Sequence, residues 1–147
     1  RDAHGISGYE VKNRDVTGFS AGGIKSVWHS AVRAGDRTLV VAESAIDAMS
    51  YHQLHPRADA RYMSTGGMPN DGQFELLKRA AAKMPEGSTI ISAVDRDRGG
   101  DLLHAALERC MAQPHVRFVR HSPVLEACKD WNDVVQRSHE RGPEIAR

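Results

Sequence analysis

Residues 88–100 read STIISAVDRDRGG, and this stretch decides the fold. Residues 88–94 form a short, mostly apolar run of the kind that predicts a strand covered on both faces of a sheet. The run ends in Asp95 and Asp97, and two glycines then lead into a segment with apolar residues at helical spacing. Ligands of open parallel sheets bind beyond the carboxyl ends of the strands, so acids at this junction are the first candidates for a functional site.

The same order of strand and helix repeats along the chain. Apolar runs predict three further strands, at 38–42, 60–64 and 116–120. Apolar residues at helical spacing predict helices around 45–54, 74–84, 102–110 and 131–139. This alternation predicts an α/β domain with about four mainly parallel strands, flanked by helices and joined by right-handed crossovers.

The first of these helices has clear ends. Ser44 precedes it as a predicted N-cap, and Pro56 stops it at His55. Four of its residues recur at helical spacing and predict one packed face: Ile46, Met49, Ser50 and Leu54.

The N-terminal region has a different pattern. Alternating residues at 8–12 and 24–32 enclose the glycine-rich segment 18–23, which predicts a β-hairpin or small meander. We therefore expect an N-terminal hairpin extension at 1–36, the α/β domain at 37–142 and a loose tail at 143–147. The chain starts at Arg1 without Met, so we expect a domain of a longer polypeptide.

Composition excludes several classes of protein. The 147 residues carry 20 Lys and Arg against 19 Asp and Glu, so no global field attracts polyanions. Aromatic residues make up only 5%, which is low for an aromatic-rich strand-binding surface. The two cysteines, Cys110 and Cys128, lack zinc-site spacing. No apolar run reaches the ~18–20 residues of a membrane span, so we expect a cytoplasmic protein without a membrane partner.

Acidic residues follow three of the predicted strands. They are Glu43 and Asp47, Asp95 and Asp97, and Asp130 and Asp133. Any one of these acids could be an N-cap or a solvated helix residue. Together they would crowd carboxylates at one sheet edge, where repulsion favours a bound cation, and oxygen ligands favour Mg²⁺ over zinc.

These motifs resemble the Toprim (topoisomerase–primase) domain, in which a Glu follows one strand and an Asp-x-Asp follows a later one. The matching segments are VVAESAIDA at 40–48 and SAVDRDRGG at 92–100. The turn STGG at 64–67 and the run KDWND at 129–133 also fit, and together with 8–13 and 18–28 they resemble Toprim domains appended to plasmid relaxases and conjugative primases. The resemblance covers about residues 5–137 and implies a Rossmann-like Toprim fold.

The resemblance also implies roles for individual residues. Asp95 and Asp97 would hold Mg²⁺, or Mn²⁺ in its place, and Asp130 would be a further ligand. Glu43 would be a metal ligand or general acid/base, and Asp47 a second catalytic candidate that supports the ligands. The structural turn residues would be Gly66, Gly67 and Gly99. Asn132 stands where primases often keep an Asp, so the resemblance leaves open whether the site holds one metal ion or two.

Basic residues near these motifs are candidates for phosphate binding: Lys12, Arg14, Lys25, Arg98 and Lys129. Each of them could equally be an ordinary solvated surface charge. We expect Trp28 and Trp131 to serve in core or hinge packing rather than in base stacking. The three tyrosines, Tyr9, Tyr51 and Tyr62, are expected in packing as well.

The resemblance implies a Mg²⁺-dependent domain of a plasmid mobilisation or replication protein, with primase-like nucleotidyl transfer. Its partners would be single-stranded DNA or primer/template nucleic acid, nucleotides, and other domains of the same polypeptide. Two alternatives stay open. The same carboxylates could serve a nuclease that cleaves phosphodiesters, because only the activated nucleophile differs. The fold could also act as a non-catalytic module that binds nucleic acid or protein.

Overall fold

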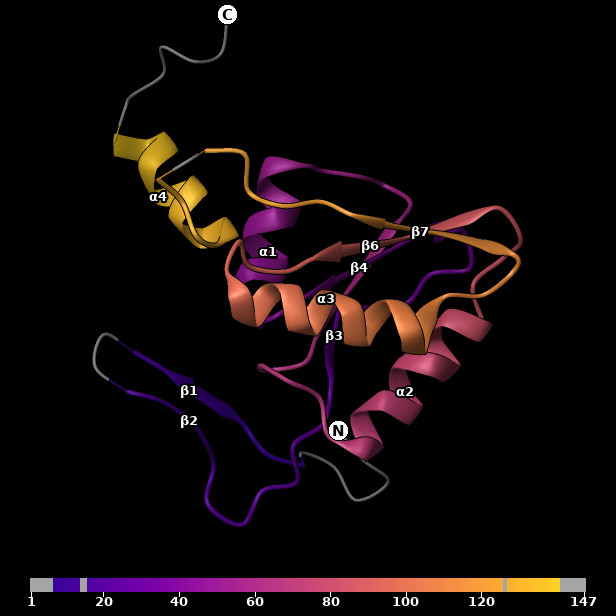
Figure 1. The fold of residues 1–147 in the computed structure, drawn as a ribbon, viewed down its shortest axis with the longest axis horizontal. Helices are drawn as coiled ribbons and strands as arrows, with labels where there is room; N and C mark the ends of the chain where they lie inside the picture. The colour runs from indigo at the N-terminus through magenta and orange to yellow at the C-terminus, as the bar shows by residue number, and fades with distance from the viewer. Residues whose placement is uncertain (1–6, 14–15, 126, 141–147) are drawn as a thin grey trace, which may run out of the picture.

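The computed structural model of the chain describes residues 7–13, 16–125 and 127–140. Its main sheet has five strands in the order β3-β5-β4-β6-β7, and Figure 1 shows helices on both sides of it. The strands are β3 (Trp28–His29), β4 (Thr38–Ala42), β5 (Ala60–Ser64), β6 (Ser88–Ala93) and β7 (Val116–Arg120). All neighbours pair in parallel except β3, which pairs antiparallel with β5. The predicted mainly parallel α/β sheet is thus confirmed, with one additional edge strand.

The helices follow the strands in alternation. They are α1 (Ala45–Leu54), α2 (Asp71–Ala82), α3 (Arg98–Met111) and α4 (Trp131–Glu140). Ser44 caps α1 as predicted, and its side chain accepts a hydrogen bond from the backbone N–H of Asp47. None of the helices in the described part of the chain is long and apolar enough to cross a membrane.

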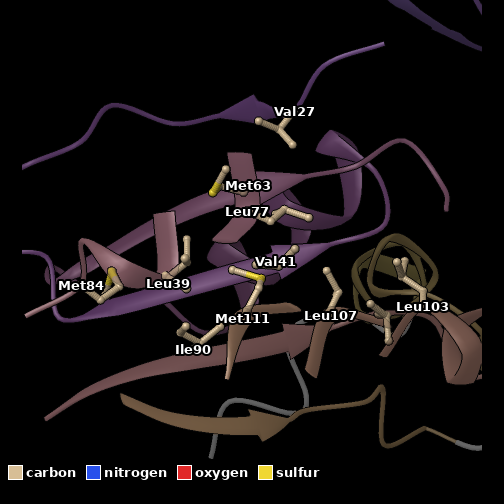
Figure 2. Close-up of a cluster of buried hydrophobic side chains, with 12 residues drawn as sticks. Val27, Leu39, Val41, Met63, Leu77, Met84, Ile90, Leu103, Leu107 and Met111 are labelled. Carbon is tan, nitrogen blue, oxygen red and sulfur yellow. The ribbon is translucent and has the colours of Figure 1, made fainter. Parts of the chain in front are cut away.

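Alternate residues of the central strands fill two cores. In β4, Leu39 and Val41 face the core under α2 and α3, while Val40 and Ala42 face the core under α1 and α4. Figure 2 shows the first core, in which Leu77 of α2 and Leu107 of α3 meet strand side chains. Because both cores are apolar, the sequence of β4 is a continuous apolar run and does not alternate between apolar and polar residues.

The packed face of α1 agrees with the predicted one at Ser50 and Leu54 and differs from it at the other two positions. Ile46 and Met49 are exposed, whereas Asp47 and Tyr51 are buried. Tyr51 packs edge-on against Trp131 of α4, with ring centroids 4.8 Å apart. The helix therefore turns a polar and aromatic face inward, because it meets α4 and the strand ends rather than a purely aliphatic core.

The N-terminal hairpin exists, but its strands differ from those predicted. β1 (Glu10–Lys12) pairs antiparallel with β2 (Thr17–Phe19), so the segment expected as a glycine-rich turn supplies the second strand. The 24–32 segment instead contributes β3 to the main sheet. In Figure 1 the hairpin projects from the body at the lower left. The expected tail at 143–147 lies outside the described residues.

Candidate metal and nucleic-acid site

The chain reverses its direction of winding between β4 and β6. From β4 it crosses through α1 to β5 on one side, and from β6 it crosses through α3 to β7 on the other. Ligands of open α/β sheets bind at such a switch point. Ala42 of β4 lies opposite Ala93 of β6 in the parallel register. Glu43 comes one residue after this pair of alanines, and Asp95 comes two residues after it. The sheet topology therefore brings the two predicted acidic motifs together.

Asp95 is the most unusual carboxylate of this edge. It is only 7% exposed, and its Oδ1 has no hydrogen-bond partner among the described residues. Burial, together with the negative charges of Glu43, Asp47 and Asp130, raises the pKa of Asp95 to about 7. A buried acceptor without a donor, surrounded by like charges, is a position that a cation would stabilise.

Asp97 lies at the start of α3. Its Oδ1 accepts a hydrogen bond from the backbone N–H of Gly100 at 2.8 Å, so it is the N-cap of that helix. Its Oδ2 lies 2.9 Å from the Lys129 ammonium, and this hydrogen bond lowers the pKa of Asp97. The N-cap role of Asp97 is thus confirmed, and its role as a metal ligand stays a prediction.

Lys129 supplies the cation that these aspartates face. Its Nζ is 2.9 Å from Asp97 and 3.7 Å from Asp95, and the hydrogen bond that Lys129 donates to Asp97 raises the pKa of Lys129. The backbone N–H of Arg96 donates to the carbonyl of Lys129 at 2.8 Å, which fixes the two loops side by side. With 58% of its side chain exposed, Lys129 can leave the carboxylates without disturbing the core.

Asp47 and Asp130 hold the surrounding helices. The Ser44 hydroxyl donates to Asp47 Oδ2, and the backbone N–H of Asn132 donates to Asp47 Oδ1 at 3.3 Å. Asp130 Oδ1 accepts from the N–H of Asp133 at 2.8 Å, in the manner of an N-cap of α4. Asp47 therefore links α1 to the start of α4 and positions both of them at the acidic edge.

Glycines allow close backbone contact around the site. The N–H groups of Gly66 and Gly67 donate to the carbonyl of Glu43 at 2.7 and 3.3 Å, and both glycines have positive φ. Gly99 lies in the first turn of α3 rather than in a turn before it. The stricter position is Gly100, where a Cβ would lie 2.0 Å from the carbonyl oxygen of Asp95.

The predicted phosphate-binding cations do not gather in one place. Lys129 meets the carboxylates, and Arg98 is exposed at the first residue of α3. Lys25 lies elsewhere, at the Gly66–Gly67 turn, and donates to the carbonyl of Met68 at 3.1 Å. Lys12 ends β1, and Arg14 lies outside the described residues.

The donor set fits a hard cation in its chemistry. Glu43, Asp95, Asp97 and Asp130 offer only oxygen, and the unpartnered Oδ1 of Asp95 gives one ligand atom. Among the described residues, however, no three His, Cys, Asp or Glu side chains already converge as a metal site. Side-chain rotation and departure of Lys129 would have to precede metal binding.

The packing role predicted for the Trp and Tyr residues holds for Trp131, Tyr51 and Tyr62 and is wrong for Trp28 and Tyr9. Trp131 is buried, and its Nε1 donates to the carbonyl of Ala93 at 3.1 Å, as core packing requires. Trp28 and Tyr9 were expected in packing but are 39% and 64% exposed. Both line one pocket beside the Gly66 turn, which no sequence pattern indicated because its walls come from five separate segments.

Comparison with known proteins agrees with this fold. The model of the family described as Toprim-like matches residues 40–135, which include Glu43, Asp95, Asp97 and Asp130. No curated protein matches the chain.

Two solved structures are similar in fold. The crystal structure of the primase fragment of the bacteriophage T7 primase-helicase protein has a TM-score of 0.58 at 22% identity, over 96% of this chain and 57% of that fragment. A chain from the structure of bacteriophage T7 lagging-strand DNA polymerase interacting with primase domains bound to an RNA/DNA hybrid and dTTP has a TM-score of 0.56 at 18% identity, over 91% of this chain and 66% of its own length. At these identities the likeness shows the fold, and this chain spans about three fifths of the relatives it matches.

Proposed function

Since the chain belongs to the Toprim-like family, we propose that it is a divalent-cation-dependent domain that acts on nucleic acid by primase-like nucleotidyl transfer. The observation that carries the proposal is the buried carboxylate of Asp95 at the switch point of the sheet, whose Oδ1 has no hydrogen-bond partner among the described residues and which lies among three further acids. The similarity of fold to primase fragments supports the choice of nucleotidyl transfer among the reactions such a site serves.

Asp95 and Asp97 would hold the cation, with Glu43 and Asp130 completing the oxygen ligands. A carboxylate-held Mg²⁺ or Mn²⁺ neutralises the charge of phosphate oxygens during phosphoryl transfer. Glu43 is the residue to accept the proton of an attacking hydroxyl, because it directly follows β4 at the acidic edge, whereas Asp47 links α1 to the start of α4. Lys129, once it leaves the aspartates, offers an ammonium to a phosphate.

The setting we propose is a larger plasmid mobilisation or replication protein, in which other domains supply template binding. The motifs at 64–67 and 129–133 support this setting through their likeness to Toprim domains of relaxases and conjugative primases. Single-stranded DNA and nucleotides are the expected partners.

Metal binding provides the first test. Calorimetric titration with MgCl₂ and MnCl₂ should show saturable binding to the wild type and at least a tenfold loss for Asp95→Asn, because the buried ligand atom loses its charge. Glu86→Gln is the matched control, since Glu86 is exposed just before β6, at the opposite end of that strand, and should bind as the wild type does. Equal binding by Asp95→Asn would refute the site.

Product analysis is the second test. The chain is incubated with a single-stranded template, nucleotides and Mg²⁺, and the products are separated on a denaturing gel. Extended products that require Asp95 support nucleotidyl transfer. Shortened template strands that require Asp95 would show that the chain is a nuclease instead. If neither extended nor shortened products form while metal binding is intact, the chain is a binding module without catalytic activity.

A further inference from the structure

A second feature of the molecule lies beside the acidic edge. A pocket of about 680 Å³ opens between the β1–β2 hairpin and the body of the fold. Its walls come from the hairpin and the residues just before it, the segment 25–28 that leads into β3, the start of α1, and the turn at 64–66. The volume falls within the ~300–1,000 Å³ of small-molecule sites. Glu43 adjoins the pocket, because its carbonyl accepts from Gly66 and α1 begins two residues later.

Exposed aromatic rings concentrate in this pocket. The chain has eight Phe, Trp and Tyr residues, and all of them are described. Three are exposed, Tyr9 at 64%, Phe19 at 37% and Trp28 at 39%, and all three line this one pocket. The other five are buried or half-buried in the two cores and helix contacts. A 5% aromatic content therefore still supplies a local set of accessible rings.

The polar groups of the pocket are few and nearly balanced in charge. Lys25 and Glu10 both line it and lie near the Gly66 turn. Thr65 is only 1% exposed, and its hydroxyl has no hydrogen-bond partner within the described residues. A buried hydroxyl without a partner points to a polar ligand group. Aromatic walls with one cation and one anion suit a flat, neutral, hydrogen-bonding ring better than a phosphate group.

We propose that this pocket binds a nucleobase of single-stranded nucleic acid, stacked on Trp28 and Tyr9, next to the metal edge. The identification of the ligand as nucleic acid rests on the proposed function. The pocket itself indicates that the base is the group recognised, because it has aromatic walls, a Thr65 hydroxyl with no partner among the described residues, and a position beside Glu43. Bases stack on aromatic side chains in sequence-tolerant fashion, because every base has a π-face. The strand would then continue from the pocket toward the carboxylates.

Tryptophan fluorescence tests the proposal directly. The chain has two Trp residues, of which Trp131 is 2% exposed and Trp28 lines the pocket. Titration of the 147-residue chain with a single-stranded oligonucleotide should quench the Trp28 emission at saturation, and Trp28→Phe should lose most of the quench while still binding. An oligonucleotide with abasic sugars in place of bases should bind about tenfold more weakly and quench little.

The variant Tyr9→Ala provides a second test. The substitution lies outside the main sheet, because Tyr9 precedes β1 of the hairpin. Anisotropy of a labelled oligonucleotide should show about tenfold weaker binding. Met49→Ala, an exposed apolar residue of α1 outside this pocket, is the control and should bind as the wild type does.

Three outcomes would overturn the inference. The first is oligonucleotide binding without quenching of Trp28, and the second is equal affinity for the abasic strand. The third is quenching that depends on protein concentration alone, which would mean that another copy of the protein fills the pocket. None of these affects metal binding by Asp95. Conversely, loss of the Mg²⁺ effect in the calorimetric test with quenching retained would refute the proposed catalysis and leave the base pocket standing.

Discussion

Lys129 places a fixed positive charge on the two aspartates that are proposed to hold a metal. Its ammonium contacts Asp97 at 2.9 Å and Asp95 at 3.7 Å, while more than half of its side chain is exposed. A tethered ammonium and a divalent cation cannot both occupy the same carboxylate oxygens. The side chain therefore competes with the metal and, once displaced, becomes available to a phosphate.

We predict that Lys129→Met raises the affinity for Mn²⁺ by roughly three- to tenfold, because the competing charge is removed from a partly solvated site. Calorimetry or the Mn²⁺ paramagnetic resonance signal measures this, with Lys83→Met as the control, since Lys83 lies at the far end of α2 from the acidic edge. The same variant should bind oligonucleotide more weakly in the presence of Mg²⁺. Weaker Mn²⁺ binding by Lys129→Met would contradict this role.

The residue types of the site could be predicted from the sequence, and their pairing could not. Glu43, Asp95 and Asp97 follow apolar runs, so a parallel sheet necessarily brings them to one edge. Lys129 was expected to meet phosphate, yet it contacts carboxylates, because the loop before α4 is held against Arg96 by a long-range backbone hydrogen bond. Such a contact depends on tertiary packing and leaves no local pattern.

At the scale of elements, the junction between β6 and α3 has the strictest steric demand near the site. The Cα of Gly100 approaches the backbone of Asp95 so closely that a Cβ would lie 2.0 Å from its carbonyl oxygen. At Gly99 the nearest atom would be Asp97 Oδ1 at 3.2 Å, the end of a side chain. The two neighbouring glycines thus offer a matched pair of substitutions.

We predict that Gly100→Ala lowers the free energy of unfolding by about 2–3 kcal/mol, since backbone must move to admit the methyl group. Gly99→Ala should change it by less than about 1 kcal/mol, because the gain in helix propensity offsets a mild contact. Urea denaturation at neutral pH measures both. Similar values for the two variants would show that α3 can shift freely away from Asp95.

The element boundaries followed from the sequence more closely than the packed faces. Prolines, caps and apolar runs predict the ends of α1 and the four parallel strands. The buried face of α1 was predicted only in part: Ser50 and Leu54 pack inward as predicted, but Asp47 and Tyr51 replace Ile46 and Met49 because partners from α4 and from the end of β7 hold them there. A periodicity count treats such residues as outward-facing, since it contains no information about partners distant in the chain.

For the whole molecule, half-buried histidines and the buried Asp95 give opposite dependences of stability on pH. Burial lowers the pKa of His55, His104 and His121 from 6.5, so the unfolded chain binds more protons and stability falls as pH drops below about 6.5. Asp95, whose pKa rises from 3.8 to about 7, binds more protons when folded, so its contribution falls as pH rises through that window. Between pH 5 and 7 the two trends oppose each other.

We predict that Asp95→Asn, in metal-free buffer, removes the second trend and leaves the first. Its free energy of unfolding should rise relative to that of the wild type by roughly 2 kcal/mol between pH 5 and 7, because the wild type loses the proton of Asp95 over that range. Urea denaturation at pH 5, 6, 7 and 8 measures the profile, with Glu86→Gln expected to run parallel to the wild type. If the profile of Asp95→Asn instead ran parallel to that of the wild type, Asp95 would be ionised over the whole pH range. The acidic edge would then accommodate its negative charges without a bound cation.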